Sequence, residues 1–330
     1  MRQQIGAENI DDSQNQQHSG VQTLIVPERG ANRRLDNYLF RILKGVPKSH
    51  VYRIVRDGQV RVNGSRVGPD LKLAVGDRVR LPPIRLVKGR SPQLSETLLS
   101  LKIPVLYEDS DLLILDKPSG IAVHGGSGLR GGVIEILRHT RTESDFLELA
   151  HRLDKDTSGC LILAKTPASL RYMHTLFREN ARRRRIQKIY HALVTGDWSG
   201  GTRRIDLGLS KRRPAGSLRR SIVCKSGENA LSYFKPVERF GDYTLMEIKL
   251  GTGRMHQIRA HAAAVGHAVV GDKMYGHQGS RKEVKRLGIR RQLLHASRLV
   301  FPHPENSRRL VVRAPYPEDL SRVLSLVERG

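Results

Sequence analysis

Cysteine is scarce in this chain of 330 residues, which contains only Cys160 and Cys224. The two lie far apart in the sequence, so they form neither a disulfide framework nor a zinc-binding pair. His256 and His261 are five positions apart and no H-E-x-x-H motif occurs, so no metal site is predicted. This cysteine usage fits a reducing compartment, and we expect a cytoplasmic protein.

Long hydrophobic runs are also missing. No apolar stretch approaches the length that spans a membrane, and residues 1–20 are rich in Gln, Asn, Asp and Ser. This N-terminal stretch lacks the apolar region of a signal peptide, and its acidic residues argue against a transit peptide. We therefore expect no membrane partner and interpret residues 1–20 as a disordered tail.

Acidic residues are too few to balance the basic ones. Lys and Arg number 58, whereas Asp and Glu number 32, which gives a formal net charge of +26. Such an excess predicts a polyanionic partner, and nucleic acid is the first candidate. A surface that is merely basic and soluble is the alternative interpretation.

Residues 21–85 have the pattern of a small ααβ module. Leu35, Leu39 and Ile42 share one face of a predicted helix, and a second helix is predicted to follow and to end at Asp57. The dipeptide Asn63-Gly64 predicts a hairpin turn between short strands. The polar side of the module carries basic side chains that are candidates for contacts with nucleic acid, among them Lys48, Arg53, Arg56 and Arg61.

Residues 86–102 mix Lys, Arg, Ser and Pro and are interpreted as a linker to a second domain, residues 103–330. In that domain, strand patterns alternate with amphipathic helical patterns. The predicted strands cover residues 105–109, 112–118, 160–164, 189–194, 230–235, 243–250, 299–301 and 310–312. The predicted helices cover residues 133–138, 169–180, 256–265 and 317–329.

Charged and polar side chains are concentrated in residues 151–159, His-Arg-Leu-Asp-Lys-Asp-Thr-Ser-Gly. This stretch runs directly into the buried strand predicted at residues 160–164. The carboxylate of Asp154 has Arg152 and Lys155 as close neighbours, and nearby cations favour the ionised form. An ionised and positioned carboxylate is a candidate nucleophile.

Three further features supply cations or aromatic rings that suit a nucleic-acid-binding site. Arg259, on a predicted helix, is well placed to pair with Asp154, although a surface ion pair is the alternative. Arg182 and Arg184 belong to a four-arginine block that either contacts phosphates or forms a solvated face. Tyr190 is either an ordinary core tyrosine or a ring that stacks on a base.

Two other enzyme classes have partial motifs. Gly126, Gly128 and Gly131 fit G-x-G-x-x-G, but no second βαβ unit supports a dinucleotide site. Residues 154–157 fit the D-x-D-x-T of magnesium-dependent aspartate phosphatases, but here the apolar strand follows the motif instead of preceding it. A non-catalytic RNA-binding assembly factor is a third alternative.

The front module resembles the S4 RNA-binding domain. The resemblance rests on Arg34-Leu35-Asp36, on Ser49 with Tyr52, on residues 58–64 and on Gly76-Asp77-Arg78-Val79. It covers the whole module and implies an RNA-binding role.

The second domain resembles the RluA-type pseudouridine synthases. The shared motifs are Lys117-Pro118-Ser119-Gly120, residues 151–154, Lys188-Ile189-Tyr190, residues 253–259, Gly271-Asp272 and Leu294-His295-Ala296. Residues 46–49 and 123–128 are most similar to the branch that acts on large-subunit (23S) ribosomal RNA. The resemblance implies an α+β fold, with a long mixed or antiparallel β-sheet, flanking helices and a cleft across its middle.

The resemblance also implies a role for individual residues. Asp154 is the catalytic aspartate, Arg152 fills the gap left by the extruded base, Tyr190 stacks on the uracil, Arg259 holds the Asp154 carboxylate and Leu294 contacts the substrate. The implied enzyme needs no cofactor and acts as a monomer on 23S ribosomal RNA or pre-50S particles. Departures from the family pattern are Met255 in place of Thr or Ser, His191 beside Tyr190, and the heavy arginine block.

Overall fold

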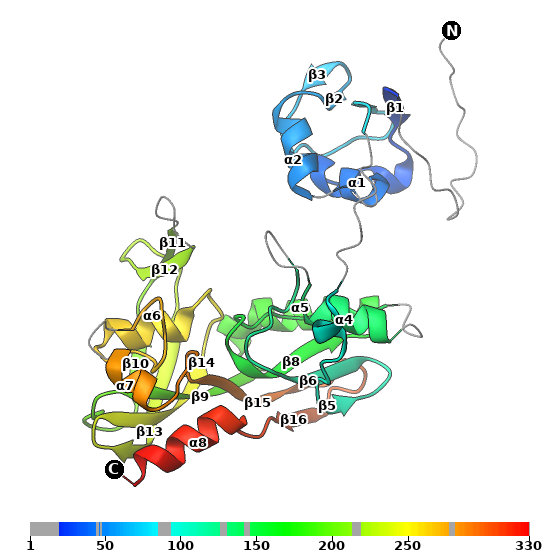
Figure 1. Ribbon diagram of the computed structural model, residues 1–330. Helices are drawn as coiled ribbons and strands as arrows, with labels where there is room; N and C mark the ends of the chain where they lie inside the picture. The colour runs from blue at the N-terminus through cyan, green and yellow to red at the C-terminus, as the bar shows by residue number, and fades with distance from the viewer. Residues whose placement is uncertain are drawn as a thin grey trace. The chain divides into compact units, whose positions relative to one another are not determined.

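The computed structural model describes residues 20–43, 46, 48–84, 94–125, 131–141, 146–212, 219–276 and 281–329. Residues 1–19 of the expected tail, residues 86–93 of the expected linker and the glycines Gly126 and Gly128 lie outside these ranges. The chain divides into two compact units, residues 1–93 and 94–330 (Figure 1). Within the described ranges, no helix is both long and apolar enough to cross a bilayer.

The first unit packs two helices against a four-stranded antiparallel sheet of order β1-β4-β2-β3. Its elements are β1 (Gln22–Ile25), α1 (Leu35–Ile42), α2 (Lys48–Arg56), β2 (Arg61–Val62), β3 (Ser65–Arg66) and β4 (Arg78–Leu81), with a short 3-10 turn at Glu28–Gly30. Strand β1 was not predicted from the sequence. It pairs with β4, so the unit begins with a strand ahead of the expected ααβ arrangement. Leu35, Leu39 and Ile54 are among the buried residues of its core.

A buried carboxylate joins the two helices of this unit. Asp36 accepts hydrogen bonds from Arg34 Nη2 at 2.8 Å and from the Tyr52 hydroxyl at 3.3 Å. The bond from Arg34 is the main reason why the pKa of Asp36 lies below its usual value. This contact gives Arg34, Asp36 and Tyr52 a structural role within the module, whereas Arg53, Arg56 and Arg61 remain exposed.

The second unit is built on a ten-stranded mixed sheet of order β10-β13-β14-β9-β15-β8-β6-β5, with β16 beside β15 and β7 beside β8. Its strands are β5 (Val105–Glu108), β6 (Leu112–Lys117), β7 (Glu148–Leu149), β8 (Ser158–Ala164), β9 (Gln187–Thr195), β10 (Arg203–Asp206), β13 (Leu231–Phe240), β14 (Tyr243–Leu250), β15 (Leu294–Pro302) and β16 (Arg309–Arg313). A separate hairpin joins β11 (Leu209–Arg212) to β12 (Arg220–Val223). The expected α+β class is confirmed.

Helices cover both faces of this sheet, because its central strands are buried on both sides. Leu113 of β6 packs with α4 and α6, whereas Leu112 packs with α5 on the other face. At the β13 end, α6 and α8 lie on opposite faces (Figure 1). The helices are α3 (Glu96–Leu99), α4 (Val133–Thr140), α5 (Pro167–Arg183), α6 (Gln257–Ala264), α7 (Arg281–Arg286) and α8 (Glu318–Val327). The short helix α3 falls within the range interpreted as a linker.

One pair of strands in the large sheet is parallel. Ser158 and Gly159 of β8 pair with His295 and Ala296 of β15. Gly159 has a φ of +105°, and a Cβ there would lie 2.3 Å from the carbonyl oxygen of Ala296. Only glycine therefore allows these two strands to approach so closely immediately after the Asp154 turn.

A buried hydrogen bond between Ser158 and His295 crosses this pair. His295 Nδ1 lies 3.0 Å from the Ser158 hydroxyl, and Nε2 lies 3.3 Å from the carbonyl oxygen of Ala314. Because a carbonyl only accepts, Nε2 carries the proton and Nδ1 accepts from the hydroxyl. Burial lowers the pKa of His295 to about 4, so the neutral ring is the folded form near neutral pH.

We predict that His295 makes the free energy of unfolding depend on pH. The unfolded chain takes up a proton at about pH 6.5, which the buried ring resists. The neutral His295 ring therefore makes its full contribution to the free energy of unfolding above pH 6.5. As the pH falls from 6.5 toward 4, the free energy of unfolding decreases by an amount on the order of 3 kcal/mol. Urea denaturation of wild type and His295→Gln, whose amide can make both hydrogen bonds without titrating, should show a flatter pH dependence for the variant. Equal slopes in this window would contradict the prediction.

Candidate active site

Asp154 lies in a turn that leads directly into β8. Its backbone carbonyl accepts a hydrogen bond from Thr157 N at 3.1 Å, which closes the turn. The preceding residue, Leu153, is buried in the core that lies beneath α4 and α6. This anchor leaves the Asp154 side chain 25% exposed, so the carboxylate is fixed by the fold and remains open to a substrate.

The guanidinium of Arg259 holds this carboxylate. Arg259 Nη1 donates to Asp154 Oδ2 at 3.1 Å, which is the contact expected from the sequence. The same guanidinium donates Nε and Nη2 to the two oxygens of Asp272, at 2.6 and 2.9 Å. Burial disfavours the charge on Arg259, but the bonds to Asp272 and Asp154 outweigh it and raise the pKa of the guanidinium. Arg259 is therefore a permanent cation in a fixed orientation.

Asp272 fixes that orientation, and the sequence interpretation assigned it no role. Its side chain is fully buried, and Oδ1 also accepts from the backbone N–H groups of Met274 and Tyr275, at 2.8 and 3.0 Å. Two backbone donors and an arginine fork satisfy a carboxylate that has no access to water. The only advance sign was its place in the Gly271-Asp272 motif.

His256 and Tyr275 complete the surroundings of the carboxylate. His256 Nε2 is 3.8 Å from Asp154 Oδ2, and Nδ1 is 3.1 Å from the Tyr275 hydroxyl. The Tyr275 ring lies 5.0 Å from the Arg259 guanidinium, and its hydroxyl bonds to the backbone of Ser221 in β12. Burial is the main cause that lowers the pKa of His256, which favours the neutral imidazole. From the sequence, His256 was part of the motif at residues 253–259, no metal-binding role was predicted for it, and no other role was assigned.

Lys117, at the end of β6, holds the Asp154 turn from one side. Its ammonium group donates to the backbone carbonyls of Pro118, Ile121 and Lys155 at 2.8, 2.8 and 3.0 Å. Burial lowers the pKa of Lys117 to about 7, whereas the three carbonyl acceptors favour the charged form. This contact explains the place of Lys117 in the Lys-Pro-Ser-Gly motif.

Arg291 and Gln292 hold the same turn from the side of β15. Arg291 Nη1 donates to the carbonyl of Asp156 at 3.0 Å, and Gln292 Nε2 donates to the Thr157 hydroxyl at 3.1 Å. Arg291 is itself oriented by a two-pronged contact with Asp319 of α8, at 2.6 and 2.8 Å. The C-terminal helix is thereby connected to the turn that carries Asp154.

Tyr190 and Leu294 lie on the adjacent strands β9 and β15, in the same buried cluster as Leu153. Burial raises the pKa of Tyr190, and the charge of Asp154 adds to this, so the phenol is neutral beside the carboxylate. Arg152 is exposed, and among the described residues its side chain makes no hydrogen bond or ion pair. It is therefore free to contact a ligand.

The other predicted basic residues lie in two groups, one in each unit of the chain. Arg182 lies in the last turn of α5, and Arg184 ends the helix with a left-handed φ of 49°. Lys48 is the first residue of α2. Arg53, Arg56 and Arg61 are on the surface of the first unit. Within the second unit, the structure thus brings Asp154, Arg259, Tyr190 and Leu294 into one region.

The arrangement argues against the phosphatase interpretation. In the described ranges, no group of three or more His, Cys, Asp or Glu side chains could hold a metal ion. The Asp154 carboxylate is occupied by Arg259, and β8 follows the D-x-D-x-T motif. A carboxylate paired with arginine can act as a nucleophile or base but is poorly placed to bind a divalent cation.

Comparison with known proteins agrees with this geometry. Residues 111–264 match the RNA pseudouridylate synthase family, and residues 33–79 match the S4 domain. A Haemophilus influenzae protein named ribosomal large subunit pseudouridine synthase C is 43% identical over 310 residues, covering 93% of this chain and 95% of the relative. A protein of the same name from Yersinia pestis is 44% identical over 313 residues, covering 94% and 97%.

The fold has also been observed in a solved structure. Human RNA pseudouridylate synthase domain containing 4 superimposes with a TM-score of 0.58 at 21% identity, covering 73% of this chain and 98% of that one. The chain therefore belongs to the RluA-type pseudouridine synthases and carries an S4 domain ahead of its catalytic domain.

Proposed function

We propose that this synthase converts specific uridines of 23S ribosomal RNA to pseudouridine, with Asp154 as the catalytic residue. The observation that carries the proposal is the Asp154 carboxylate, a quarter exposed and held by the buried Arg259. The relatives named for the ribosomal large subunit support the choice of RNA. Free 23S RNA or a pre-50S particle is the partner, and the enzyme acts as a cytoplasmic monomer.

The reaction rearranges bonds without a net redox change. The N1–C1′ bond of the uridine breaks, the base turns, and a C5–C1′ bond forms while the proton on C5 is lost and N1 gains one. Asp154 either attacks C1′ or removes a proton from the sugar, and both routes require the ionised carboxylate. Arg259 keeps that carboxylate oriented by a charge-assisted hydrogen bond. No cofactor is required by this chemistry.

The target base must leave the RNA helix before Asp154 can reach its sugar. Unstacking and unpairing a base costs a few kcal/mol, which contacts in the enzyme pocket offset. Tyr190 is the ring that stacks on the flipped uracil, and Leu294 forms the apolar wall beside it. The exposed and unpaired Arg152 fills the gap that the base leaves in the RNA stack.

The exposed cations outside the active site supply affinity for the RNA backbone. Arg53, Arg56 and Arg61 in the S4 domain, together with Lys48, would contact phosphates of one RNA segment. Arg182 and Arg184 at the end of α5 would contact another. Binding of this kind is not sequence-specific, so the choice of uridine depends on the pocket and on RNA shape.

We predict that Asp154→Asn binds 23S RNA like the wild type but releases no tritium from uridine labelled at C5. The amide is nearly isosteric but cannot act as nucleophile or base. Asp197→Asn is a matched control, because Asp197 is an exposed carboxylate in a surface ion pair with Arg239 at 3.4 Å. Turnover of the Asp154 variant at the wild-type rate would refute the assignment of the catalytic residue.

Arg259→Lys should lower kcat by about 100-fold, or about 2.7 kcal/mol in transition-state free energy. A lysine ammonium is a single charged point and cannot bridge Asp272 and Asp154 as the arginine fork does. Single-turnover rates should be measured at a temperature where circular dichroism shows the variant folded, since its buried partner Asp272 is also affected. A folded variant with wild-type kcat would mean that Arg259 does not orient the nucleophile.

Affinity for RNA should fall steeply with salt, with a log–log slope of roughly −0.7 to −0.9 per neutralised phosphate. Arg53→Gln should weaken binding by a similar factor for all RNA sequences and reduce that slope by about one. Arg309→Gln, an exposed arginine on β16, is the control and should change neither quantity. Salt-independent binding by the wild type would exclude a backbone role for the basic surface.

A further inference from the structure

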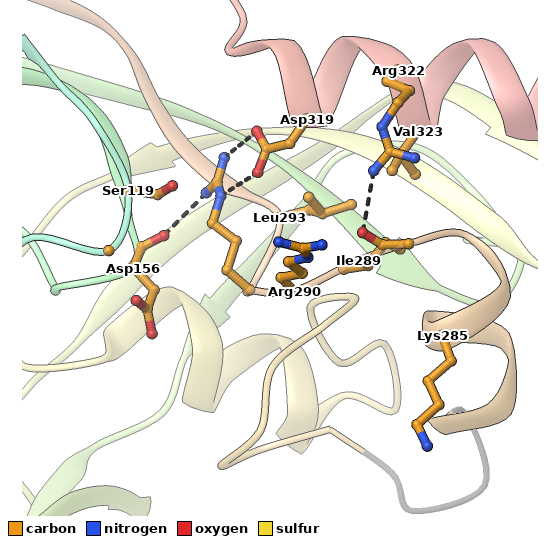
Figure 2. A pocket seen from close by; sticks show the side chains of 12 residues that line it. Ser119, Asp156, Lys285, Ile289, Arg290, Leu293, Asp319, Arg322 and Val323 are labelled. Atoms are coloured by element: carbon orange, nitrogen blue, oxygen red, sulfur yellow. Dashed lines mark hydrogen bonds and ion pairs between the residues drawn. The ribbon is translucent and has the colours of Figure 1, made fainter.

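A pocket of about 780 Å³ borders the turn that carries Asp154. It shares Asp156, Arg291 and Asp319 with the contacts that hold this turn, but neither Asp154 nor Arg259 lines it. Figure 2 shows Lys285 of α7, Arg290 of the following loop and Arg322 of α8 on one side of it. Ser119 and Asp156 form the opposite side. The pocket is large enough to take one nucleotide.

The pocket carries an excess of positive charge. Arg290 and Lys285 are exposed, and among the described residues neither makes a hydrogen bond or ion pair. Arg322 donates to the carbonyls of Leu287 and Gly288, both at 3.2 Å, and these neutral acceptors do not offset its charge.

The two carboxylates on the pocket wall do not cancel this charge. Asp319 is neutralised by its two-pronged contact with Arg291. The backbone carbonyl of Asp156 accepts a hydrogen bond from Arg291. Figure 2 shows the Asp156 carboxylate on the side away from that contact. A cradle of unpaired guanidinium and ammonium groups with one remaining carboxylate favours an anion, above all a phosphate that accepts from an arginine fork.

The pocket and the catalytic carboxylate share one structural element. Asp156, on the pocket wall, follows Asp154 by two residues, a span of at most ~7 Å of chain. Gly120, also on the wall, donates its N–H to the carbonyl of Lys155 between them, at 3.0 Å. A strand of RNA whose target sugar lies at Asp154 can therefore reach the pocket with a neighbouring nucleotide.

We propose that this pocket binds the phosphodiester of a nucleotide that flanks the target uridine. Arg290 is the contact to the phosphate, and Ser119 offers its hydroxyl to the sugar side. Lys285 adds positive charge at the edge of the pocket, because Figure 2 shows its ammonium pointing away from Arg290 and Arg322. The proposal rests on the function proposed above, because it takes the RNA strand at Asp154 as its starting point. By holding this phosphodiester, the pocket fixes the position of the RNA strand along the enzyme and so determines which nucleotide lies at the Asp154 carboxylate.

The first test compares Arg290→Gln and Lys285→Gln with Arg313→Gln, an exposed arginine on β16 outside the pocket. Each pocket variant should raise both Kd and KM for 23S RNA by about threefold to tenfold, with kcat and melting temperature unchanged, because a flanking contact is made equally in ground and transition state. The salt slope of binding should fall by about one for each. The control should match the wild type. Pocket variants that match the wild type in KM and salt slope, or a control that loses as much as they do, would overturn the proposal.

A second test locates the phosphate. Single uncharged methylphosphonates are placed on either side of the target uridine in a 23S fragment that the wild type modifies. At one position the substitution should weaken binding as much as Arg290→Gln does, and the two losses combined should be no larger than either alone. Additive losses at every flanking position would refute the contact. If the wild type forms no pseudouridine in any 23S RNA, the proposed function is refuted. If the wild type turns over and Arg290→Gln changes neither KM nor binding, only the proposed role of the pocket is refuted.

Discussion

The active site depends on one guanidinium shared by two carboxylates. Removing charged groups from water is costly, and a buried pair is tolerated only when its geometry is good and its remaining donors and acceptors are satisfied. The pair of Arg259 and Asp272 meets this condition through a two-pronged contact and two backbone N–H donors on Asp272. The remaining nitrogen of the guanidinium, Nη1, then donates one hydrogen bond to Asp154, whose side chain is the most exposed of the three.

The turn at Asp154 is held by groups from distant parts of the chain. Lys117 fixes it from β6, Arg291 from the segment before β15, and Asp319 acts through Arg291 from α8. Hydrogen bonds from several rigid elements keep the Asp154 carboxylate in place better than a surface loop does, because each element would have to move before the carboxylate could. The precision of the site is thus a property of the whole sheet.

The sequence identified the parts of this site that have a local signature. The polar stretch at Asp154 followed by a buried strand, the helix that carries Arg259 and the strand that carries Tyr190 are all present. The roles of Asp272 and Lys117 were not predicted, because a buried lysine and a loop aspartate gain their meaning from partners far away in the sequence. The parallel pairing of β8 with β15 escaped detection for the same reason, and β1 because four residues carry too little periodicity.

The pairing of Ser158 with His295 has a consequence for synthesis of the protein on the ribosome. Residues separated by more than a hundred positions must meet before β8 can pair with β15, and closing so large a loop is slow and entropically costly. Asp319, which completes the contact on the turn, lies close to the C-terminus. A nascent chain that already displays its folded S4 domain therefore lacks this support of the Asp154 turn until Asp319 has been synthesised, so the S4 domain can fold before the candidate site is complete.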